Sequence, residues 1–190
     1  AFRLADIVNG LNLQMFLYLF NVCADGSNPY AGVPAGVLYM HAARSVMTVE
    51  TKRSAEKDIA GQEDKAFGMN GIVITNPDCD IPAAMEHDLA GKYIPVRLKK
   101  SGVGGSLASL EQLGLLQRKI EALVADMGNA LQNGQIGQHP VQAKDHDKTC
   151  EYCDFASVCA FKKSVTPRTY DDQTDSAVLA ELEKEGESHA

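Results

Sequence analysis

The 190-residue sequence has no tryptophan and no apolar run long enough to span a membrane. Its longest apolar stretch, residues 13–20, includes a glutamine and is far shorter than the roughly 18 residues of a membrane helix. The first residues also lack the basic segment and cleavage site of a signal peptide. We therefore expect a cytoplasmic protein without a membrane partner. The chain does not begin with methionine, which suggests that it was cut from a larger protein.

Basic residues are also scarce, with 18 lysines and arginines against 25 acidic residues and a formal net charge of −7. Residues 171–190 carry −6 of that charge, and the other 170 residues carry only −1. We interpret residues 166–190 as a flexible acidic tail. Since the remainder is nearly neutral, the net charge does not exclude a nucleic-acid partner. The hydrophobic fraction of 45% is sufficient for a folded core and excludes a disordered chain.

The spacing of apolar residues predicts two long helices. Between residues 4 and 23, apolar side chains recur every three or four positions and fill most of the others, which predicts a helix buried on most of its circumference. An apolar stripe predicts a second helix over residues 110–133. Ser109 and Gln112 form a possible capping box at its start, and Gly134 follows its end.

Short apolar runs between turn-forming residues predict strands near residues 37–41, 71–75 and 93–100. We expect a flexible turn at 101–105, where glycines are frequent, and a polar surface excursion between residues 44 and 71. Helices that alternate with strands indicate a mixed α/β fold.

Three of the five cysteines lie in one ten-residue string: Cys150, Cys153 and Cys159. This spacing lets the first two thiolates face one metal, and the third lies near enough to join them. One hypothesis is a small zinc-stabilised binding or scaffold module in which His146, or His139, supplies the fourth ligand. The other is an iron–sulfur cluster whose fourth cysteine lies elsewhere, since Cys23 and Cys79 are more typical of a core residue and a loop thiol.

Two further groups of residues are candidates for a site. Gln14 and Tyr18 are four residues apart and therefore share one face of the first predicted helix. An amide in so apolar a helix needs partners, which the protein core or a site for phosphate or catalytic groups could supply. The second group is a set of bases with no acid among them, which forms either a solvated strand face or a contact for DNA phosphates: Lys92, Arg97, Lys99 and Lys100.

Together, the Gln-x3-Tyr helix and the Cys-x2-Cys-x5-Cys string resemble the RecB-like branch of the PD-(D/E)XK nuclease superfamily, in the form found in AddAB-type helicase-nucleases. The resemblance spans about residues 1–165 and also includes the predicted strands at 34–39 and 94–99. It implies a partial restriction-endonuclease-like α/β core that lacks its N-terminal strands, in a C-terminal fragment of the parent protein. Glu50-Thr51-Lys52 imitates half of the catalytic signature but follows the helix, whereas the family's signature precedes it.

The resemblance also implies an activity: Mg²⁺-dependent hydrolysis of DNA by an ATP-dependent helicase-nuclease that degrades double-strand breaks for recombinational repair. The Asp and Asp-x-Lys that bind Mg²⁺ in this family lie upstream of the helix, so we expect the chain alone to be inactive, with Gln14 and Tyr18 in supporting roles. The implied partners are DNA and an AddA-type subunit. Three ligands of a 4Fe–4S cluster are implied, although this fragment could hold neither cluster nor Mg²⁺: Cys150, Cys153 and Cys159.

Overall fold

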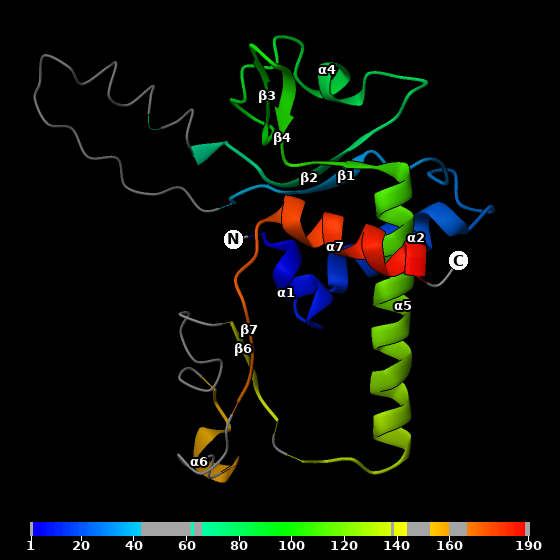
Figure 1. Cartoon of the computed structure of the whole chain (residues 1–190), viewed down its shortest axis with the longest axis vertical. Coiled ribbons are helices and arrows are strands. Elements are labelled where there is room, and N and C mark those ends of the chain that lie inside the picture. Colours follow the sequence, from blue (N-terminus) through cyan, green and yellow to red (C-terminus); the bar gives the residue numbers. More distant parts are fainter. Residues whose placement is uncertain are drawn as a thin grey trace, which may run out of the picture. The chain divides into compact units, whose positions relative to one another are not determined.

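A computed structural model describes residues 2–42, 62, 66–137, 139–143, 153–159 and 167–188. The chain divides into two compact units, one of residues 1–2 and 14–114 and the other of residues 3–13 and 115–190. Helices and strands are mixed in both units, which confirms the predicted α/β class (Figure 1). Among the described residues, no helix combines the length and hydrophobicity of a membrane span.

A three-stranded sheet with the order β1–β2–β5 forms the centre of the first unit. The middle strand, β2 (Asn70–Thr75), pairs antiparallel with β1 (Gly36–Tyr39) and parallel with β5 (Leu107–Ser109). The four central residues of β2 are buried, as its continuous apolar run requires. The strands predicted at 37–41 and 71–75 are therefore confirmed, whereas β5, only three residues long, was not predicted.

A second pair of strands forms an antiparallel hairpin, β3 (Val96–Lys99) with β4 (Gly102–Gly105). The sequence predicted β3 within residues 93–100, but the flexible turn predicted at 101–105 is wrong, because most of that segment is β4. Three of the four β4 residues are glycines, so the strand has no alternating pattern that could reveal it. The hairpin joins the core of the unit through Val96, which clusters with the buried residues Val73, Ile81, Leu89 and Ile94.

The single helix predicted over residues 4–23 is also wrong, because the chain forms two helices there, α1 (Leu4–Val8) and α2 (Gln14–Ala24). Between them, Gly10 has a φ of +88°, a conformation that a side chain disfavours. A Cβ atom at Gly10 would also lie 2.8 Å from Cε of Met127. The break separates the two units at this point of the chain.

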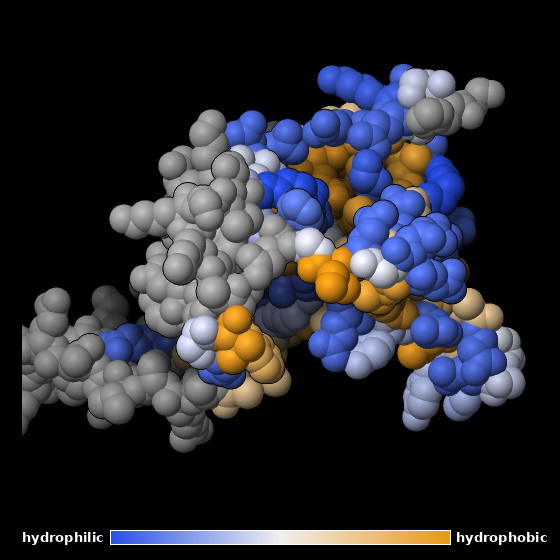
Figure 2. All heavy atoms as spheres, turned by 90° about the horizontal axis from the view of Figure 1, so that it is seen from below, coloured by the Kyte–Doolittle hydropathy of each residue, from blue (hydrophilic) through white to orange (hydrophobic). Residues whose placement is uncertain are grey.

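The apolar surface of α2 is less buried than the sequence predicted. Only Phe16 is fully buried, and its ring lies 6.2 Å from that of Phe2 and 5.9 Å from that of Phe20. Met15 and Val22 keep 37% and 38% of their surface exposed. Hydrophobic residues such as Leu98 and Ile136 are exposed outside α2 as well, and Figure 2 shows hydrophobic patches on one face of the molecule in orange. The described residues thus leave part of the apolar surface of α2 exposed.

The long helix predicted over residues 110–133 is confirmed as α5 (Leu110–Gln132), which begins in the first unit and continues in the second. Its capping box is formed: the Ser109 amide donates to Oε1 of Gln112 at 2.8 Å, and the Gln112 amide donates to Oγ of Ser109 at 3.1 Å. Gly134 follows with a φ of +66°, as a C-terminal cap requires.

The acidic segment 166–190, expected as a flexible tail, contains a strand and a helix, β7 (Arg168–Tyr170) and α7 (Asp175–Ser188). β7 pairs parallel with β6 (Val141–Ala143), and α7 packs against α1. Three apolar side chains of α7 are buried: Val178, Leu179 and Leu182. Their spacing places them on one face of the helix, so the acids occupy the faces that remain.

Candidate functional site

The candidate residues Gln14 and Tyr18 lie in the first turns of α2 and contact each other. Nε2 of Gln14 donates a hydrogen bond to the Tyr18 hydroxyl oxygen at 2.7 Å, so the two residues share a face as predicted. Both side chains are exposed, and Tyr18 keeps 55% of its surface open to solvent. The amide therefore obtains its hydrogen bond from its neighbour on the helix, and the pair faces outward, where a ligand or another segment can reach it.

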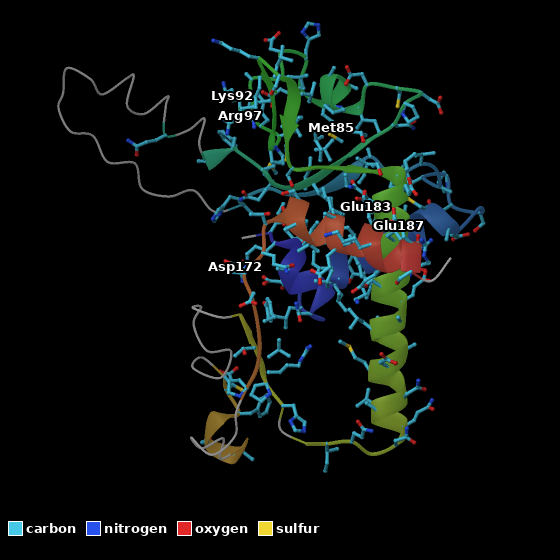
Figure 3. All side chains as sticks on the ribbon, viewed as in Figure 1. Met85, Lys92, Arg97, Asp172, Glu183 and Glu187 are labelled. Carbon is cyan, nitrogen blue, oxygen red and sulfur yellow. The ribbon has the colours of Figure 1, made fainter. Side chains whose placement is uncertain are left out.

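The four basic candidates are all exposed: Lys92, Arg97, Lys99 and Lys100. Arg97 and Lys99 belong to β3 and, being two residues apart, point to the same side of the hairpin. Lys92 lies in the preceding loop, beside Arg97 in the view of Figure 3, and its Nζ atom is 5.1 Å from the centre of the Tyr93 ring. The structure thus gathers these bases around one strand.

A buried carboxylate that the sequence did not reveal holds this loop in place. Glu86 is only 8% exposed, and its carboxylate accepts hydrogen bonds from three successive backbone amides. The distances are 2.9 Å to the nitrogen of Lys92 and 3.0 Å to those of Tyr93 and Ile94. Burial alone would raise the pKa of Glu86, but these hydrogen bonds outweigh it and hold the pKa below its ordinary value. Glu86 is therefore charged at neutral pH.

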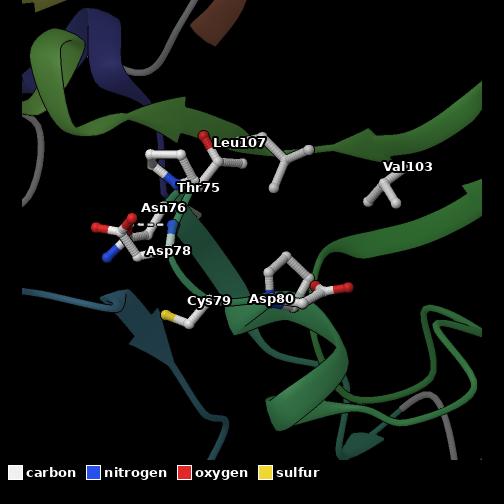
Figure 4. Close-up of a pocket in the computed structure, with 9 residues that line it drawn as sticks. Thr75, Asn76, Asp78, Cys79, Asp80, Val103 and Leu107 are labelled. Atoms are coloured by element: carbon white, nitrogen blue, oxygen red, sulfur yellow. Dashed lines mark hydrogen bonds between the residues drawn. The ribbon is translucent and has the colours of Figure 1, made fainter.

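At the carboxyl end of β2, the chain surrounds an open hollow of about 500 Å³ (Figure 4). The two carboxylates among the lining residues, Asp78 and Asp80, lie on opposite sides of the turn in Figure 4. Oδ1 of Asp80 accepts a hydrogen bond from the Ala83 amide and so caps α4 (Ile81–Met85). Among the described residues, no three His, Cys, Asp or Glu side chains converge as metal ligands. Glu50 and Lys52, the imitation of the catalytic signature, lie outside the described residues.

The cysteine string is described only in part. Cys150 and His146 lie outside the described residues, and Cys159 is described by its backbone alone, as the last residue of α6 (Ala156–Cys159). The thiol of Cys153 is exposed and belongs to no disulfide. Of the two remaining cysteines, exposed Cys79 agrees with its interpretation as a loop thiol, whereas Cys23 is only half-buried and does not belong to the buried core.

In the second unit, Asp6 lies at the centre of a polar network that the sequence did not reveal. Its carboxylate accepts a 2.6 Å hydrogen bond from the Tyr170 hydroxyl and forms a 2.8 Å ion pair with Arg3. Arg3 also lies 3.4 Å from Asp172, and the Leu4 amide donates to Oδ1 of Asp175 at 2.8 Å. These contacts join the start of the chain to β7 and to the first turn of α7.

The surroundings of Tyr170 in this network shift the pKa of its hydroxyl group, and the shift can be measured. Burial, reinforced by the hydrogen bond to Asp6, raises the pKa of Tyr170 to about 12. Because the folded pKa lies above the unfolded value of about 10, the stabilisation is complete below pH 10 and is lost as the pH rises toward 12. In an ultraviolet titration, the difference between the wild type and Tyr170→Phe should lack a step near pH 10. A step of ordinary pKa in that difference would contradict the network.

A comparison with known protein families places the chain in a known class of proteins. A sequence model of the PD-(D/E)XK nuclease superfamily matches residues 2–160, and the chain belongs to this superfamily. The sheet around β2 and the long helix α5 therefore form part of a nuclease core.

Among individual proteins, the chain is similar to the B subunits of bacterial ATP-dependent helicase/deoxyribonucleases. It is 30% identical over 198 aligned residues to the B subunit of a Bacillus cereus strain, and the alignment covers 97% of this chain and 17% of the relative. The B subunit of Oceanobacillus iheyensis is also 30% identical over 198 residues, covering 98% of this chain and 17% of the relative. The chain thus spans about 17% of the length of these relatives.

Proposed function

We propose that this chain is part of an AddB-type subunit that hydrolyses phosphodiester bonds of DNA at double-strand breaks and so serves recombinational repair. The observation that carries the proposal is the nuclease-superfamily match over residues 2–160. The names of the relatives support a helicase-nuclease as the parent protein. Its proposed partners are DNA and an AddA-type helicase-nuclease subunit.

Within this proposal, Gln14 and Tyr18 support an active site whose Mg²⁺-binding carboxylates and lysine precede this chain in the parent protein. The 2.7 Å hydrogen bond between the two side chains fixes the orientation of the Gln14 amide at the exposed start of α2. From there the amide and the hydroxyl can contact a DNA phosphate or orient the catalytic lysine. Mg²⁺ supplies the charge that stabilises the scissile phosphate in such enzymes.

We further propose that Cys150, Cys153 and Cys159 provide three of four thiolates for a 4Fe–4S cluster, with the fourth cysteine upstream. The donor set fits such a cluster, since thiolates are the ligands that it requires. The cluster would serve as a staple for the end of the domain. The alternative, a zinc module with His146 as fourth ligand, predicts stoichiometric zinc without iron in a metal analysis of the longer protein.

The proposal is tested by comparing DNA cleavage by this chain with that by a longer protein that includes the preceding part of an AddB-type subunit. With added Mg²⁺, the longer protein should cut linear DNA and the 190-residue chain should not. Robust Mg²⁺-dependent cleavage by the chain alone would contradict the proposal, because it would place the catalytic carboxylates within residues 1–190.

A further inference from the structure

The two faces of the β3–β4 hairpin differ in chemistry. Residues paired across an antiparallel ladder project to the same side. Arg97 pairs with Gly104 and Lys99 with Gly102, so one side of the hairpin holds two cations opposite two glycines. We call these four residues the glycine face. On the other side Leu98 pairs with Val103, which places two apolar side chains there.

Gly102 and Gly104 add no side chain of their own to this face, and the space over Gly102 is open. A Cβ atom built on Gly104 would lie 3.3 Å from Cδ of Lys99 and 3.4 Å from its Cε and Nζ atoms. The Lys99 side chain therefore lies across the hairpin, with its ammonium group close to Gly104. The base of the Arg97 side chain lies against Gly91, since a Cβ atom on Gly91 would lie 3.1 Å from the Arg97 Cβ. The cations thus border a stretch of β4 backbone that is open at Gly102 and covered by the Lys99 side chain at Gly104.

In the described part of the chain, the two acids that precede this hairpin make contacts elsewhere. Glu86 accepts the amides of residues 92–94, and Asp88 contacts its neighbour His87 at 3.1 Å in an exposed turn. Within the part of the chain that the structure describes, no carboxylate is ion-paired with Arg97, Lys99 or Lys100. The positive charge of the glycine face is therefore available to an external anion.

We propose that the glycine face binds the sugar-phosphate backbone of a DNA strand without reading its sequence. The planar guanidinium of Arg97 can hold two oxygens of one phosphate, and Lys99 supplies a point charge for the next. Glycine permits a close approach of backbone to ligand, so the strand can pass directly over Gly102 and meet the Lys99 ammonium beside Gly104. The inference rests on the proposed function, because DNA is its ligand.

The test measures binding of the whole 190-residue chain to a fluorescent single-stranded oligonucleotide at several salt concentrations. Each phosphate contact on a single strand contributes about 0.7 to the slope of log affinity against log salt, so Arg97→Gln with Lys99→Gln should lower the slope by about 1.4. The same variant should weaken binding by about tenfold. The matched control, Arg118→Gln with Lys184→Gln, removes two exposed cations of the second unit and should leave both quantities unchanged.

A second variant, Gly104→Val, tests this stretch of β4 backbone while keeping every charge. The φ of Gly104 lies outside the range that side chains avoid, so the strand can accept valine, which displaces Lys99 and fills the space between the cations. Circular dichroism should show an unchanged fold, and affinity should fall several-fold. Unchanged affinity in Gly104→Val, equal effects of the charge variant and its control, or no binding by the wild type would each overturn the inference.

Failure of this inference can be told apart from failure of the proposed function. If the longer protein cuts DNA with Mg²⁺ but the glycine-face variants bind DNA normally, only the inference fails. If the variants lose binding as expected but the longer protein cuts no DNA, only the proposed nuclease activity fails.

Discussion

Replacing Glu86 with alanine is expected to lower the free energy of unfolding by about 3 kcal/mol, since buried groups that lose a charged hydrogen-bond partner cost about 1 to 3 kcal/mol each. The carboxylate is 8% exposed and accepts hydrogen bonds from the backbone amides of three consecutive residues. Its removal therefore leaves all three amides without this acceptor. Urea denaturation followed by far-ultraviolet circular dichroism measures the change. The exposed carboxylate two residues later provides the control, and Asp88→Ala should change stability by less than about 0.5 kcal/mol.

The same interaction predicts a dependence of stability on pH. Because the folded pKa of Glu86 is depressed, its contribution is present above the unfolded carboxyl pKa of about 4.3 and is lost as the pH falls through the lower, folded value. The wild type and Glu86→Gln should therefore differ most in stability at neutral pH and converge in acid. A difference that grows as the pH falls would contradict this account.

Replacing Asp6 with alanine should destabilise the second unit by a similar amount, about 3 kcal/mol, since the Tyr170 hydroxyl loses its acceptor and the partly buried Arg3 guanidinium loses its nearest carboxylate. Asp6 is 5% exposed, and its partners Arg3 and Tyr170 lie at opposite ends of the chain. The loss should therefore loosen β7 and α7 together. Hydrogen exchange of the α7 amides, compared between Asp6→Ala and the wild type, measures this directly.

Asp126→Ala is the matched control, because Asp126 is an exposed carboxylate on α5 in the same unit. It should leave the exchange of α7 unchanged. If Asp6→Ala also left exchange and stability unchanged, the network around Asp6 would not hold the C-terminal helix, and the burial of Val178 and its neighbours would have to suffice alone.

The elements that the sequence predicted correctly have local signals. Ser109 and Gln112 are three residues apart, and the start of α5 follows from that spacing and the apolar stripe behind it. The run at 71–74 likewise needs no distant information to be recognised as a buried strand. The resemblance to the nuclease superfamily rests on comparably short motifs, and the match over residues 2–160 confirms it.

The features that the sequence did not predict depend on residues far apart in the chain or on groups, such as backbone amides, that leave no pattern in the sequence. Glu86 binds backbone amides, which every residue provides, and Asp6 contacts Tyr170 across 164 positions of the chain. A glycine can occur within a helix, so Gly10 alone did not predict a break. The break after α1 is explained by the positive φ of Gly10 and its close approach to Met127. The strand β4 consists mostly of glycines and therefore has no alternating pattern. In α7, the short apolar stripe is hard to recognise among the many acids of the segment.

The sequence identified the candidate site residues, and the structure supplied the geometry of those that it describes. The shared face of Gln14 and Tyr18 follows from helical spacing, but their exposure does not, because so apolar a helix predicts burial. The basic cluster was visible in the sequence, whereas its glycine neighbours gained meaning only through the register of the hairpin. The cysteine spacing remains a prediction about a metal site.

The most direct test of the proposed nuclease is single-turnover cleavage of end-labelled linear DNA by the longer protein, with and without Mg²⁺. The proposal predicts Mg²⁺-dependent cleavage that slows by about 10- to 100-fold in Gln14→Ala, as expected for a residue that orients catalytic groups. Asn21→Ala, which removes another exposed amide of α2, should leave the rate unchanged. Absence of Mg²⁺-dependent cleavage in the longer wild-type protein would contradict the proposal.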